Sequence, residues 1–88
     1  MDEHARRVMA PVVTALDGYD AGQASIEAVQ SAAETAANAL DNAHGELVEA
    51  LGDAERELES VRFTMSPDNQ RTAVLRIGAS LRRAIAAS

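Results

Sequence analysis

Cysteine, lysine and tryptophan are absent from this 88-residue chain, and phenylalanine and tyrosine occur once each. Without cysteine, the chain can form no disulfide framework and can offer no thiolate to a metal or a reaction. Disulfides belong to oxidising compartments, so their absence favours a reducing, cytoplasmic location. The scarcity of aromatic rings leaves few large side chains for a core and few platforms on which nucleic-acid bases could stack.

Long apolar runs are also missing. Alanine occurs 19 times, whereas Leu, Ile, Val and Phe together number only 18. This supply of large apolar side chains suits a single domain, residues 1–88, and the length leaves no room for a second. No run approaches the roughly 20 apolar residues that a bilayer requires, so we expect no membrane span. Met1–His4 lacks the basic and apolar regions of a secretory signal, so we expect no cleavable leader.

Strand signals are absent, and helical spacing is present along the whole chain. No run of β-branched or aromatic residues alternates with polar residues. The sequence therefore predicts an all-α chain, with its first helix near residues 3–18 and its last near 67–86. Asp2 before the first helix, and Ser66 with Pro67 before the last, are signals for a helix start. The expected buried face of the first helix consists of Val8, Val12, Leu16 and Tyr19.

The middle of the chain predicts one long helix that begins after Ser25. Its apolar positions follow steps of three and four: Ile26, Val29, Ala33, Ala36, Leu40, Ala43, Leu47, Leu51, Ala54, Leu58 and Val61. No proline interrupts residues 25–63, so we expect a three-helix antiparallel bundle with a central helix about 55 Å long. The alternative is a break near Asn42–Gly45, with Gly45 ending a helix, which would give a compact four-helix bundle.

The three-helix arrangement is only two helices thick. It would leave apolar surface uncovered, and the alanines within Ala32–Ala43 would allow another helix to approach closely. We therefore expect a twofold homodimer that buries part of this surface. The four-helix alternative could be a monomer.

Acidic residues are concentrated in the middle of the chain. The net charge is −6, with −8 in residues 24–60 and +4 in residues 61–88. Four acids follow steps of three, four and four and therefore line one ridge of the central helix: Glu46, Glu49, Asp53 and Glu57. The ridge favours a protein partner with a basic surface, and the acidic middle argues against nucleic acid. The other interpretation is a helix face that only contacts water.

The remaining polar and aromatic residues have structural explanations. The arginines of the last helix are expected to pair with acids of the central helix: Arg71, Arg76, Arg82 and Arg83. Tyr19 and Phe63 are expected to cover the ends of the helix pair, although an exposed Tyr19 would suit an interface. His4 and His44 have no second His or Cys at ligand spacing, so we expect no metal. No phosphate loop, glycine fingerprint or Ser-His-Asp order occurs, so we expect no cofactor and no catalysis.

The order of several features along the chain carries one resemblance. Gly18–Gly22 precedes Ser25, which opens a long acidic helix, and Glu57–Phe63 precedes a short helix that carries arginine. This order resembles small helical immunity-type proteins of bacterial toxin systems. The resemblance covers most of the chain and assigns no site residues. It implies a bacterial protein that binds one toxin and blocks it.

Two classes of function follow from these observations. The first is a non-catalytic, acidic protein of the immunity or inhibitor type, which binds a partner protein and neutralises or regulates it. Its expected partner-binding residues are Glu46, Glu49, Asp53, Glu57 and Tyr19. The alternative is a structural or assembly protein that acts through helical homo-oligomerisation, such as a phage or secretion-system component.

Overall fold

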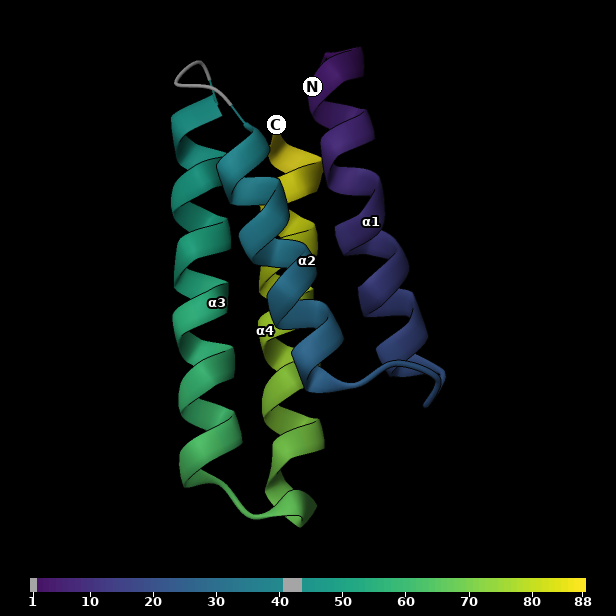
Figure 1. Cartoon of the computed structure of the whole chain (residues 1–88), viewed down its shortest axis with the longest axis vertical. Coiled ribbons are helices and arrows are strands. Elements are labelled where there is room, and N and C mark those ends of the chain that lie inside the picture. The colour runs from purple at the N-terminus through teal and green to yellow at the C-terminus, as the bar shows by residue number, and fades with distance from the viewer. Residues whose placement is uncertain (1, 41–43) are drawn as a thin grey trace.

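The computed structural model describes residues 2–40 and 44–88, and these residues form four helices and no strand (Figure 1). The helices are α1 (Glu3–Asp20), α2 (Ile26–Ala39), α3 (Gly45–Thr64) and α4 (Pro67–Ala87). The all-α class expected from the sequence is confirmed.

The single helix expected over residues 25–63 is wrong, because the structure divides this segment into α2 and α3. Helix α2 ends at Ala39, and the backbone of Leu40 is extended, with φ −78° and ψ 147°. Gly45 begins α3 rather than ending a helix. Asn42 and Ala43, on which the expected break also fell, lie outside the described residues. Because α2 and α3 pack side by side, the radius of gyration is only 12.3 Å and the longest dimension 37 Å.

Neighbouring helices run antiparallel along the long axis of the molecule (Figure 1). Helix α2 packs against both α1 and α3, and α4 packs against α3 and less extensively against α1. The turn between α1 and α2 includes Gly22, whose φ of 76° favours glycine. Helices α3 and α4 therefore lie side by side along their length, and α1 is held mainly by α2.

The apolar spacing of the middle segment predicts the core correctly even though the predicted helix was not continuous. The buried residues of α2, Leu40 and α3 are Ile26, Val29, Ala33, Ala36, Leu40, Leu47, Leu51, Ala54, Leu58 and Val61. Helix α4 completes the core with Ala73, Val74, Ile77, Gly78 and Leu81. An antiparallel hairpin turns the same stripe of both helices toward one centre, so the stripe alone does not reveal the break.

Helix α1 differs in detail from its prediction. Its buried residues are Ala5, Met9, Val12 and Leu16, while Val8 and Tyr19 are half-buried against the core. Pro11 lies within the helix on its exposed side and does not end it. The Asp2 carboxylate accepts a hydrogen bond from the backbone N–H of Ala5 at 2.8 Å, which confirms the expected cap.

The starts of α2 and α4 use different local contacts. Ser25 Oγ accepts a hydrogen bond from the N–H of Ala28 at 3.1 Å, as expected for an N-cap. Ser66 makes no such bond, and its Oγ instead accepts one from the side-chain amide of Asn69 at 3.2 Å. Pro67 occupies the start of α4, where its missing N–H leaves no backbone bond unmade.

The four-helix arrangement removes the reason given for a dimer through Ala32–Ala43. Ala33 and Ala36 are buried in the core, and Ala32 and Ala37 are half-buried against it. Most of the alanine stripe that was expected to face a second copy therefore faces the chain's own helices.

Candidate functional site

The four acids predicted to form a ridge lie on α3, and all four are exposed. We call Glu46, Glu49, Asp53 and Glu57 the acidic ridge. Among residues 2–40 and 44–88, Glu46 and Glu49 have no ion-pair partner. Asp53 pairs with Arg56 of the same helix, and Glu57 lies 3.9 Å from Arg76 of α4. The N-terminal half of the ridge, Glu46 and Glu49, therefore presents carboxylates that the described part of the chain does not neutralise.

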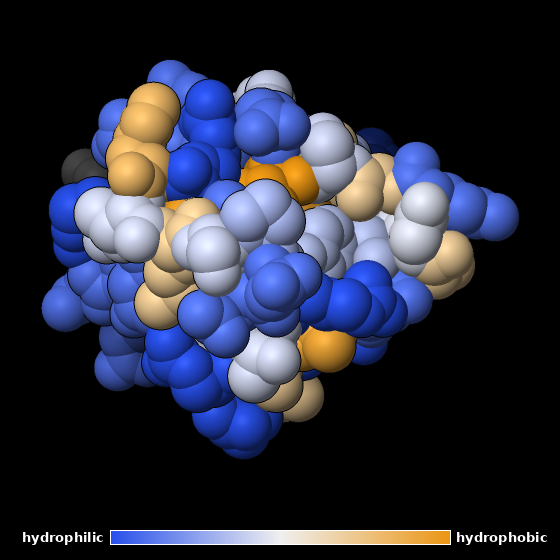
Figure 2. Space-filling model, turned by 90° about the horizontal axis from the view of Figure 1, so that it is seen from below, coloured by the Kyte–Doolittle hydropathy of each residue, from blue (hydrophilic) through white to orange (hydrophobic). Residues whose placement is uncertain are grey.

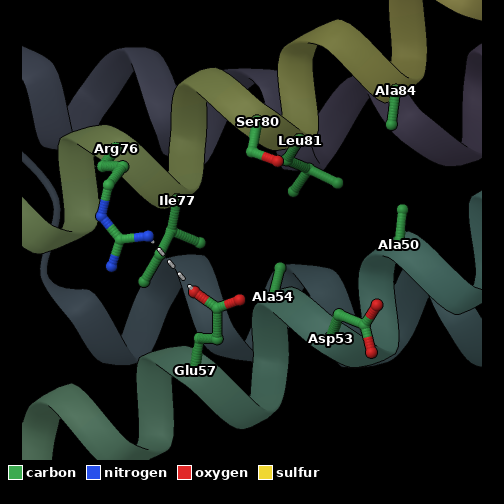
Figure 3. Close-up of a pocket in the computed structure, with 9 residues that line it drawn as sticks. All are labelled: Ala50, Asp53, Ala54, Glu57, Arg76, Ile77, Ser80, Leu81 and Ala84. Atoms are coloured by element: carbon green, nitrogen blue, oxygen red, sulfur yellow. Dashed lines mark ion pairs between the residues drawn. The ribbon is translucent and has the colours of Figure 1, made fainter.

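A groove runs beside the ridge, between α3 and α4. Its main hollow has a volume of about 180 Å³ and is lined by Ala50, Asp53, Ala54, Glu57, Arg76, Ile77, Ser80, Leu81 and Ala84. Figure 3 shows why it is open: Ala50 and Ala84 face each other with short side chains, while Glu57 and Arg76 bridge one end. A second, smaller hollow continues the groove past Glu46 toward the C-terminal end of α4.

The acids of the ridge do not contribute equally to this groove. Glu46, Asp53 and Glu57 line its two hollows, whereas Glu49 is absent from both linings. Spacing along the helix explains the difference, because Glu49 lies further around α3, toward the side that faces away from α4. The sequence predicted the ridge but not the groove, which depends on which helix lies beside α3.

Most arginine contacts of α4 go to α1 rather than to the central segment, contrary to expectation. Arg71 donates hydrogen bonds to the carbonyl oxygens of Tyr19 at 3.4 Å and Asp20 at 2.9 Å. Arg82 donates to the carboxylates of Asp17 at 2.8 Å and Asp20 at 3.0 Å. The end of α1 attracts cations because the helix dipole is negative there and two aspartates lie in its last turn. Only Arg76 of α4 forms an ion pair with α3 among the described residues.

Tyr19 is not brought to the acidic ridge. It lies at the end of α1, half-buried against the core, and the guanidinium of Arg71 lies 5.7 Å from the centre of its ring. Helices α1 and α3 occupy opposite sides of the view in Figure 1. Tyr19 therefore belongs to a different part of the surface from the four acids.

Phe63 does not cover the end of the helix pair as the sequence predicted. Its side chain is 70% exposed near the turn between α3 and α4, with the guanidinium of Arg62 5.1 Å from the ring centre. Met65 in the same turn is also exposed. Figure 2 views this end of the molecule and shows apolar side chains in separate patches among polar ones. Phe63 lies within α3 but off its buried stripe, because it is two residues beyond Val61, the last buried residue of that helix.

His4 and His44 join no ligand cluster among residues 2–40 and 44–88. Within the described residues, no group of three or more His, Asp or Glu side chains is arranged to hold a metal ion. His44 Nε2 lies 3.4 Å from a carboxylate oxygen of Asp2, which links the starts of α3 and α1. The hydrogen bond from the Ala5 N–H is the main cause that lowers the pKa of Asp2. None of the helices, over the residues described, has the length and apolar character needed to cross a membrane.

Comparisons with models of protein families, with curated proteins and with solved structures found no match to this chain. The resemblance to immunity-type proteins therefore stays a prediction from the order of sequence features.

Proposed function

We propose that the protein is a non-catalytic module of the immunity or inhibitor type, which binds a basic partner protein through the acidic ridge and so neutralises or regulates it. One observation carries this proposal. Arg71 and Arg82 of α4 bind the end of α1, while Glu46 and Glu49 have no ion pair within the described residues. Arg71 and Arg82 are thus engaged at α1, and among the described residues only Arg76 of α4 forms an ion pair with the ridge.

The exposed charge suits fast recognition of a basic surface. Residues 24–60 carry a balance of −8, and the ridge holds four of their nine acids on one helix. Exposed charges attract an opposite surface over about 8 Å at physiological salt, which speeds encounter more than it strengthens the final complex. A partner is therefore expected to associate quickly at low salt and more slowly as the salt concentration rises.

The test compares two variants with the same loss of charge. The ridge variant is Glu46→Gln/Glu49→Gln/Asp53→Asn, and the control variant is Glu34→Gln/Glu55→Gln/Glu59→Gln. Glu34 lies on α2, and helical spacing places Glu55 and Glu59 on the flank of α3 away from α4. A partner captured from a lysate of the source organism is purified, and its association rate with each form is measured at low and high salt.

The ridge variant should associate about tenfold more slowly at low salt, while the control variant should stay close to the unmodified protein. Circular dichroism should show the same helical content in all three forms. An association rate that changes neither with the ridge substitutions nor with ionic strength would reject the proposal. The binding surface would then have to be sought around Tyr19 or Phe63.

A further inference from the structure

The two edges of the α3–α4 groove carry opposite charges. Glu46, Asp53 and Glu57 line the α3 edge. The α4 edge carries Arg76, which lines the groove, and Arg83, which lies seven residues further on the same side of the helix. Arg83 is exposed and has no ion-pair partner among residues 2–40 and 44–88. Between the edges lie the short side chains of Ala50, Ala54, Ser80 and Ala84.

The charges on the two edges also match in their position along the helices. Glu57 and Arg76 are at the same level, because their side chains are 3.9 Å apart. Ala84 lines both the hollow that contains Asp53 and the one that contains Glu46. The neighbouring Arg83 therefore lies at a level between those two acids. Acid and arginine thus face each other across the groove at two levels.

Such a face is complementary to itself. A twofold axis parallel to the helices would place α3 of one copy against α4 of the other, with levels along the axis unchanged. Glu57 would then face Arg76 of the second copy, and Glu46 and Asp53 would flank its Arg83. A twofold axis across the helices would place α3 against α3 and bring acids together. We propose that the α3–α4 face binds a second copy of this chain about an axis parallel to the helices.

The size and lining of the face suit this occupant. It extends along the 37 Å axis of a molecule 22 and 19 Å across, which offers close to the ~800 Å² per partner of a standard interface. The short side chains between the edges allow two helix pairs to approach closely. Figure 3 shows this floor, with Ala50, Ala54 and Ala84 open toward the groove.

This dimer stands on a different observation from the proposed function and does not rest on it. It uses the arginine edge as well as the acids, and it would cover Glu46, Asp53 and Glu57. Self-association and binding of a basic partner would therefore exclude each other at this edge. Homo-oligomerisation was the second class of function expected from the sequence, and the dimer would use α3 and α4 rather than the Ala32–Ala43 stripe.

Three charge variants test the dimer and its symmetry. The first reverses the acidic edge (Glu46→Arg/Glu57→Arg), and the second reverses the arginine edge (Arg76→Glu/Arg83→Glu). The third combines all four substitutions, so that the four substituted positions exchange sign, Asp53 stays acidic and the net charge remains −6. Sedimentation equilibrium from about 10 µM to about 1 mM measures the dissociation constant of each form. Circular dichroism checks that each remains helical.

The unmodified protein should show concentration-dependent mass approaching twice that of the chain. The dissociation constant of each single-edge variant should rise at least about tenfold, and the variant with all four substitutions should bind more tightly than either of them. An unmodified chain that remains monomeric at every concentration measured would overturn the inference. Single-edge variants with unchanged affinity would also overturn it. The same holds for a variant with all four substitutions that stays monomeric while its helical content is intact. The partner assay above is read separately, so either proposal can fail alone.

Discussion

Leu16 of α1 packs so closely on Gly78 of α4 that a Cβ atom on residue 78 would lie 3.2 Å from Leu16 Cδ2. Both residues are buried, and α1 has less extensive contact with α4 than with α2. Gly78 therefore allows a close approach of α1 to α4, in a seam that also contains the exposed contacts of Arg71 and Arg82. Any larger side chain at this position has to displace Leu16 or separate the two helices.

The first prediction follows from this contact. Gly78→Leu should destabilise the fold by about 1–3 kcal/mol, because the added atoms have no space beside Leu16. Gly52→Leu is the control, since a Cβ there meets only Arg56 Nη1, at 3.5 Å and at the end of a flexible side chain. The control should be as stable as the unmodified chain or more so, because glycine is a poor helix former. Urea unfolding measures both, and equal losses would show that the seam is not tight at Gly78.

The second prediction separates Phe63 from the core. Phe63→Ala should change the free energy of unfolding by less than about 0.5 kcal/mol, because the ring is 70% exposed. Leu58→Ala, one turn earlier and fully buried, should cost about 2–5 kcal/mol. Thermal or urea unfolding of the two variants gives the comparison. A loss of several kcal/mol for Phe63→Ala would mean that the ring covers the core, as the sequence predicted.

The sequence was most informative about which residues are buried. The steps that connect Leu47, Leu51 and Leu58 reflect the period of a helix, and that period directs one stripe to the core in any packing arrangement. Burial therefore follows from local spacing. The end of α2 at Ala39 does not, because helices on both sides of the connection keep the same apolar phase.

The candidate site shows the same limit. Spacing alone places Glu46, Glu49, Asp53 and Glu57 on one side of α3. The groove needs Ala50 of α3 to lie opposite Ala84 of α4, and that depends on how the helices neighbour one another. The contacts of Arg82 with Asp17 span 65 residues and depend on the same tertiary arrangement. The sequence signal for the groove is the short side chains of Ala50 on α3 and Ala84 on α4.

The third prediction concerns acid. The hydrogen bond from the Ala5 N–H lowers the pKa of Asp2; partial desolvation opposes this, and the nearby His44 and His4 add to it. A carboxyl with a lowered pKa in the folded state stabilises the fold above its unfolded pKa and loses this effect as the pH falls through the folded value. Asp2→Asn removes the titration but keeps an oxygen that can cap α1.

Unfolding free energies of the unmodified chain and Asp2→Asn are compared from about pH 6 to about pH 2. The unmodified chain should be the more stable at the upper end, and the difference should shrink as the pH falls. A difference that is independent of pH would show that the charge of Asp2 does not contribute to the start of α1.

The fourth prediction tests the division of the middle segment into α2 and α3. Arg62 Nε lies 3.1 Å from Glu27 Oε1, and Arg62 also donates to the side chain of Gln30 at 2.7 Å. These contacts require the end of α3 to lie beside the start of α2. In a continuous helix, residues 31 and 59 would be about 42 Å apart at 1.5 Å per residue. In packed antiparallel helices, the axes are only about 10 Å apart.

Spin labels at Ser31→Cys and Glu59→Cys distinguish the two arrangements, and the absence of native cysteine leaves no other thiol to be labelled. Both positions are exposed, so the labels should not disturb the core. Pulsed electron–electron double resonance at low protein concentration should give a distance between the two labels well below about 30 Å, after allowance for the length of the label arms. A peak near 42 Å would restore the continuous helix. It would also separate Glu27 from Arg62 and remove the compact core on which the α3–α4 groove depends.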